Sequence, residues 1–94
     1  MSEPDPVPLP IDGILDLHTF HPREVKDLVP EYLEECRRRG IYDVRIIHGK
    51  GSGTLRRIVH SLLDKNTSVA SYREADIGAG GWGATSVRLK PGTD

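Results

Sequence analysis

The stretch ILDLHTFHPREVKDLVPEYLEECRRRGIYDVRIIHGKGSG, residues 14–53, decides the fold. Alternating apolar residues predict a strand over 11–18, and a second apolar run predicts another strand over 42–49. Between them, over 22–39, apolar residues recur at the spacing of one helix face: Val25, Leu28, Val29, Tyr32, Leu33 and Cys36. Strand, helix and strand in this order predict a right-handed parallel crossover.

The remainder of the chain extends this pattern. A second helical stripe predicts a helix over 54–65, and weaker strands are expected over 68–75 and 83–90. The predicted fold class is therefore α+β, a two-layer β-α-β-α-β-β sandwich with two helices on one face of a mixed four-stranded sheet. We expect a single domain over 11–90, an extended proline-rich arm over 1–10 and a short tail over 91–94.

Composition excludes several classes of protein. No apolar run approaches the ~20 residues that span a bilayer, and we expect neither a signal peptide nor a membrane partner. Cys36 is the single cysteine, which favours a reducing, cytoplasmic setting without disulfides. A net charge of −1 argues against coating nucleic acid by bulk attraction, yet residues 44–63 carry four basic side chains, two histidines and no acid. A local basic site is therefore expected.

The ends of the first two predicted strands carry polar residues. The first ends in Asp16 and His18, and the second ends in His48 and a glycine-rich loop. Parallel neighbours end at the same edge of a sheet, where open sheets bind ligands. The loop also delivers the chain to a helix N-terminus, whose free amides favour an anion. We therefore expect these side chains to converge on a phosphate, although a glycine-rich turn without a ligand explains the loop equally well.

The candidate catalytic residues are Asp16, His18 and His48. An imidazole can give or take a proton at neutral pH, as phosphodiester cleavage requires, so His48 is the first candidate; its alternative role is to cap the following helix. Asp16 could orient His18, assist His48, or hold Mg²⁺ or Mn²⁺ through its oxygens. Its alternative role is a turn residue that binds backbone amides.

Further residues are candidates for binding phosphate or bases: Gly49, Lys50, Gly51, Gly53, Arg56 and Trp82. The glycines could instead serve only to supply positive φ, and Trp82 could fold back over the core rather than stack on a base. Arg57 is expected on a solvated helix face, and His60 is expected to be exposed. The run of arginines at 37–39 suits the end of the first helix.

Three motifs, LDLH at 15–18, IIHGKGSGTLR at 46–56 and GGWGATSVRL at 80–89, together resemble the Smr (small MutS-related) domain. The resemblance covers about residues 11–90 and implies a fold like the C-terminal domain of translation initiation factor three. It also implies a mismatch-repair-related endonuclease acting on DNA or RNA, here as a stand-alone bacterial-type member. A non-catalytic nucleic-acid-binding module is the alternative, and the oligomeric state stays open, with a monomer as one option.

The chain departs from this family in one place. The first motif of the family usually continues into a glycine, whereas Thr19 and Phe20 follow His18 here. The path of the chain after His18 is therefore the least predictable part of the site.

Overall fold

A computed structural model describes residues 11–49, 53–75 and 83–91. Its elements run β1 (Ile14–Asp16), α1 (Pro22–Arg38), β2 (Asp43–Ile47), α2 (Thr54–Lys65), β3 (Val69–Glu74) and β4 (Ala84–Leu89). The predicted α+β fold and element order are confirmed. The predicted arm over 1–10 lies outside the described residues.

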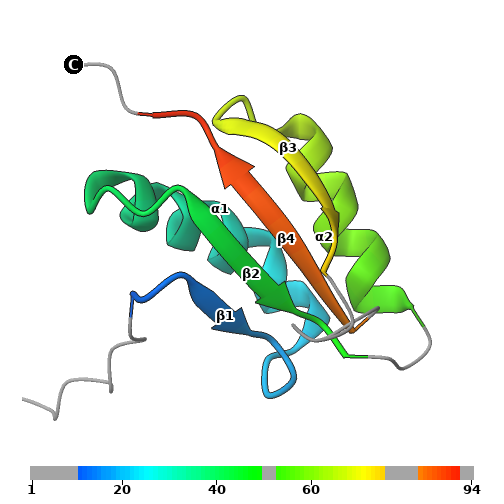
Figure 1. Ribbon diagram of the computed structural model, residues 1–94. Helices are drawn as coiled ribbons and strands as arrows, with labels where there is room; N and C mark the ends of the chain where they lie inside the picture. The colour runs from blue at the N-terminus through cyan, green and yellow to red at the C-terminus, as the bar shows by residue number, and fades with distance from the viewer. Residues whose placement is uncertain (1–10, 50–52, 76–82, 92–94) are drawn as a thin grey trace, which may run out of the picture.

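The sheet is mixed, with strand order β1-β2-β4-β3. β1 runs parallel to β2, as the crossover predicts, while β4 is antiparallel to both β2 and β3. Both helices lie against one face of this sheet, and the other face is left open (Figure 1). The two faces therefore have different chemistry.

The core lies between the sheet and the helices. Leu15 and Ile46 from neighbouring strands, and Val29 and Leu33 from α1, are almost completely buried, and Cys36 joins them. α1 continues through Pro30 without a break, so the predicted single helix is confirmed. Burial of this apolar stripe stabilises the packing of α1 on the sheet by about 25 cal/mol for each Å² of apolar surface removed from water.

Two local devices fix the ends of α1. Glu24 accepts a hydrogen bond from the backbone N–H of His21 at 2.8 Å, closing the first turn. At the other end Gly40 has φ +75°, and Ile41 N–H donates to the Cys36 carbonyl at 2.8 Å, which ends the helix at Arg38, one residue before the predicted boundary. The chain then turns directly into β2.

Tyr32 ties α1 to the short strand β1. Its hydroxyl oxygen accepts the Gly13 N–H at 3.1 Å and donates to the Ile14 carbonyl at 3.1 Å. Burial raises the pKa of this phenol to about 12, so it stays protonated. The contact positions β1 at the edge where the candidate site begins.

Candidate functional site

The ends of β1 and β2 lie side by side. Leu17 N–H donates to the Ile47 carbonyl at 2.8 Å, so the residues after Asp16 and Ile47 leave the sheet from adjacent positions. The expected meeting of two segments 30 residues apart is confirmed for the backbone. The sheet edge shared by LDLH and IIHG is therefore a real feature of this fold.

The side chains leave this edge on opposite faces, which corrects the expected convergence. Leu15 pairs with Ile46 and Asp16 pairs with Ile47. Paired residues of a parallel ladder point the same way and alternate along the strand, so His48 shares the buried face of Ile46 while Asp16 points to the open face. The candidate site is thus divided into an exposed group and a buried group.

The exposed group is the pair Asp16 and His18. One carboxylate oxygen of Asp16 accepts the backbone N–H of His18 at 3.0 Å and lies 2.7 Å from its Nδ1. The hydrogen bonds from His18 hold the pKa of Asp16 below its usual range. Because the imidazole is 68% exposed, its Nε2 is open to an incoming substrate. Asp16 thus orients His18 and caps its amide, combining two of the roles considered from the sequence.

The turn after His18 closes without a glycine. Phe20 N–H donates to the Leu17 carbonyl at 3.0 Å, and among the described residues no amino acid other than glycine has positive φ. Leu17 to Phe20 therefore form an ordinary tight turn, with His18 and Thr19 at its centre, in which no side chain is strained. Although Thr19 and Phe20 stand where the family usually has a glycine, the hydrogen bonds between Asp16 and His18 are formed.

The buried group is centred on His48, which is 5% exposed. Its Nε2 lies 2.8 Å from Thr85 Oγ1 and its Nδ1 lies 3.3 Å from the Gly49 carbonyl. Burial lowers the pKa of the imidazole, so it is neutral at pH 7. His48 is therefore a neutral hydrogen-bonding group rather than a fixed charge.

His60 completes this group, contrary to the expectation that it would be exposed. Its Nε2 lies 3.0 Å from the same Thr85 oxygen, and its ring meets His48 edge-on with centroids 6.2 Å apart. Tyr72 packs on its other side at 4.8 Å. Helical spacing could not predict this role of His60, because its partner Thr85 lies 25 residues away in the sequence.

The hydrogen positions follow from counting donors. Thr85 has a single hydroxyl proton, and the Gly49 carbonyl can only accept. His48 therefore carries its proton on Nδ1, Thr85 donates to His48 Nε2, and His60 donates from Nε2 to Thr85. This assignment satisfies the Thr85 hydroxyl and both ring nitrogens of His48, and it presents one N–H of His48 beside Gly49.

A cavity of about 250 Å³ opens beside His48 and Gly49. It lies at the N-terminus of α2 and is lined by Pro22, His48, Gly49, Gly53, Thr54, Leu55 and Arg56. Gly49 and Gly53 have φ of +84° and +90°, so their predicted conformational role is confirmed. The first amides of a helix attract anions, which makes this cavity suited to a phosphate group. Lys50, Gly51 and Trp82 lie outside the described residues.

The cationic side chains near the cavity are partly neutralised. Arg56 forms an ion pair with Glu74, whereas Arg57 is exposed as expected. At the far end of α1, Arg37 pairs with Glu34, and Arg38 and Arg39 both pair with the neighbouring Glu35. That arginine run is therefore balanced by acids of its own helix.

The described residues contain no group of three histidine, cysteine, aspartate or glutamate side chains placed to share an ion. Asp16 offers one carboxylate, and one of its oxygens already serves His18. A hard cation there would take its other ligands from water and substrate.

Comparison with known proteins places the chain in a family. The Smr domain model matches residues 15–90. Endonuclease MutS2 of Clostridium acetobutylicum is 41% identical over 76 residues, and that of Clostridium tetani is 35% identical over 80. These matches cover 81% and 85% of this chain but 10% of each relative, so the chain spans about a tenth of their length.

Two solved structures share the fold. The Smr domain of Thermus thermophilus MutS2 has a TM-score of 0.79 and 37% identity, covering 83% of this chain and 98% of that one. YdaL, a stand-alone small MutS-related protein from Escherichia coli, has a TM-score of 0.79 and 29% identity, covering 86% and 66%. In the described part of the chain, neither helix has the length and apolarity needed to cross a membrane.

Proposed function

Because the chain belongs to the Smr domain family, we propose that it is an endonuclease that hydrolyses phosphodiester bonds in DNA or RNA. The observation that carries the proposal is the exposed Asp16–His18 pair, with a 2.7 Å contact, at the sheet edge that it shares with His48. A carboxylate that orients an accessible imidazole is the arrangement that general acid–base catalysis requires.

The two groups at this edge have different roles in the proposal. His18 Nε2 takes a proton from water as the water oxygen bonds to phosphorus and the P–O bond to the leaving oxygen breaks, while Asp16 holds the ring through Nδ1. The leaving oxygen takes its proton from solvent. The cavity at the start of α2 holds a phosphate of the substrate through helix amides. The neutral His48 donates its Nδ1–H to the Gly49 carbonyl and so positions Gly49, which lines this cavity.

A second candidate function is nucleic-acid binding without cleavage. It is favoured by the burial of His48, whose two ring nitrogens are already in hydrogen-bonding contact within the fold. These hydrogen bonds account for the position of His48 by stabilisation of the fold alone, without a role in catalysis. The glycine-rich loop after His48 and the cavity at the start of α2 would then bind nucleic acid without cleaving it.

The deciding experiment is a cleavage assay on matched DNA and RNA substrates, with magnesium, with manganese and with a chelator. Replacing His18 by Asn should lower the rate by ~10²–10⁴ because it removes proton transfer. His21→Asn is the matched control, since His21 is also exposed in the same connection and has no part in the proposed chemistry. Equal rates for the two variants would remove His18 from the mechanism, and no cleavage by the wild type would favour the binding module.

Asp16→Asn distinguishes two possible roles of the Asp16 carboxylate, which are to orient His18 and to hold a metal ion. If Asp16 only orients His18, the rate should fall with an unchanged response to metal concentration. If it holds Mg²⁺ or Mn²⁺, the variant should require more metal to reach half its maximal rate. Full activity at every metal concentration would leave Asp16 as a turn residue.

A further inference from the structure

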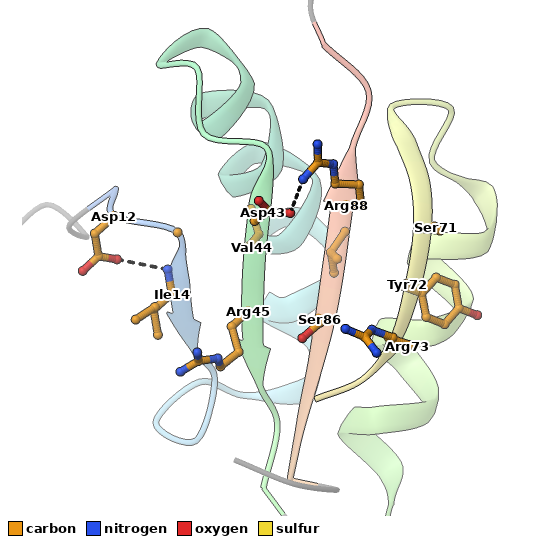
Figure 2. A pocket seen from close by; sticks show the side chains of 12 residues that line it. Asp12, Ile14, Asp43, Val44, Arg45, Ser71, Tyr72, Arg73, Ser86 and Arg88 are labelled. Carbon is orange, nitrogen blue, oxygen red and sulfur yellow. Dashed lines mark hydrogen bonds and ion pairs between the residues drawn. The ribbon is translucent and has the colours of Figure 1, made fainter. Parts of the chain in front are cut away.

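The face of the sheet that the helices leave open is hollowed across all four strands. The hollow has a volume of about 570 Å³ and runs from β1 to β3 (Figure 2). Its lining includes the small residues Gly13, Ser71 and Ser86. The charged residues that line it are Arg45, Arg73, Arg88, Asp12 and Asp43. Nothing in the roles proposed for His48 and the α2 cavity uses this face.

The strand register places a single row of side chains across this hollow. Ile14 pairs with Arg45, Arg45 pairs with Ser86, and Ser86 pairs with Arg73. Neighbouring strands lie ~4.8 Å apart, so the two arginines stand about 10 Å apart with a serine hydroxyl between them. This row thus presents two guanidinium groups and one hydroxyl on the open face.

The charges of this row are available, unlike those of the next row. Arg88 pairs with Asp43 at 2.6 Å, which neutralises it. Within the described parts of the chain, Arg45 and Arg73 have no acidic partner within ion-pair distance. Two unpaired guanidinium groups on a hollow surface attract an anion that offers two neighbouring oxygens, such as the non-bridging oxygens of a phosphodiester.

The position of the row relates it to the candidate site. Asp16 pairs with Ile47, which lies two residues beyond Arg45 on the same face of β2. The row of Arg45 and Arg73 is therefore the neighbour of the row that ends in Asp16. A strand of phosphates lying along Arg73, Ser86 and Arg45 would reach β1 at Ile14, two residues or ~7 Å along the strand from Asp16.

The chemistry of the hollow favours backbone contacts over base reading. Tyr72 belongs to the same strand as Arg73, but it points away from the hollow in Figure 2, and its hydroxyl donates to Asp64 on α2. Among the described residues, the strands of the open face carry no phenylalanine, tyrosine or tryptophan side chain directed into the hollow on which a base could stack. Guanidinium contacts to phosphate carry no sequence information.

We propose that Arg45, Ser86 and Arg73 form a track on the open face of the sheet for the sugar–phosphate backbone of one nucleic-acid strand, leading it to Asp16 and His18. The track rests on the proposed action on nucleic acid and adds the direction from which the strand arrives. It binds without sequence preference.

The test is binding of fluorescein-labelled oligo-thymidine and oligo-uridine to the full chain by anisotropy at 50 to 200 mM salt. The variant Arg45→Gln with Arg73→Gln removes two phosphate contacts, so the slope of log affinity against log salt should become shallower by ~1.4 units. The four-fold rise in salt should then weaken the wild type about seven-fold more than the variant. Arg88→Gln is the matched control on the same face and should leave the slope unchanged.

The outcomes separate this proposal from the proposed function. An unchanged slope in the double variant, or an equal effect of Arg88→Gln, overturns the track even if the wild type cleaves. A shallower slope supports the track even if no cleavage occurs. The absence of measurable binding by the wild type overturns the track. A double variant that binds nucleic acid normally but loses self-association in sedimentation also overturns it, because the open face would then be an interface between copies of the chain.

Discussion

Replacing Thr85 by Val tests whether its hydroxyl holds the buried group together. Thr85 is completely buried, and its oxygen bridges His48 at 2.8 Å and His60 at 3.0 Å. Valine has nearly the same shape, so no cavity forms, but His48 Nε2 loses its partner at a site that is 5% exposed. An unsatisfied buried polar atom costs ~1–3 kcal/mol, whereas half-buried His60 can bind water instead.

We therefore expect Thr85→Val to lower the free energy of unfolding by ~1–3 kcal/mol, and the melting temperature by roughly 5–20 °C for a domain of this size. Urea titration followed by circular dichroism at pH 8 measures the change. Ser86→Ala is the matched control, because the neighbouring hydroxyl lies on the open face and should matter by less than ~0.5 kcal/mol.

A double-mutant cycle isolates the contact. His48→Leu combined with Thr85→Val should cost less than the sum of the two single changes, because the second change no longer leaves a partner unsatisfied. Additive effects, or a Thr85→Val variant as stable as Ser86→Ala, would refute the proposed hydrogen-bond chain.

Two further predictions concern pH and charge. Burial lowers the pKa values of His48 and His60 from 6.5, so stability should be full above pH 6.5 and decline as the pH falls below it; a flat unfolding free energy between pH 7.5 and 5 would contradict this. Glu74→Gln releases Arg56 and should raise nucleic-acid affinity a few-fold in anisotropy titrations, while Glu34→Gln, an equal charge change far from the cavity, should not. Equal effects of the two substitutions would show that only net charge matters.

Much of the fold is predictable from periodicity. The second helix occupies the expected residues 54–65, and α1 ends one residue before the expected boundary, because apolar stripes and helix-ending glycines are local signals. The strands are shorter than predicted, β1 most of all, since only Ile14–Asp16 lies within the ladder. Strand ends depend on partners that a local pattern does not contain.

The site is less predictable because its contacts are long-range. The sequence identifies Asp16, His18 and His48 and their shared sheet edge, yet alternation along β2 already places His48 on the face of Ile46. Applied to both strands, that alternation is enough to separate the two histidines onto different faces. The bridge from His48 through Thr85 spans 37 residues and depends on the sheet order, which hydrophobic spacing alone leaves open.

The burial of Cys36 gives the domain an internal reporter of its own opening. The chain has one cysteine, and its side chain is inaccessible on the buried face of α1, where desolvation also raises the thiol pKa. A thiol reagent can modify it only when α1 lifts from the sheet, so the labelling rate of the native protein measures the population of that open form. The fraction of molecules in which α1 is open from the sheet can thus be measured without introducing a probe.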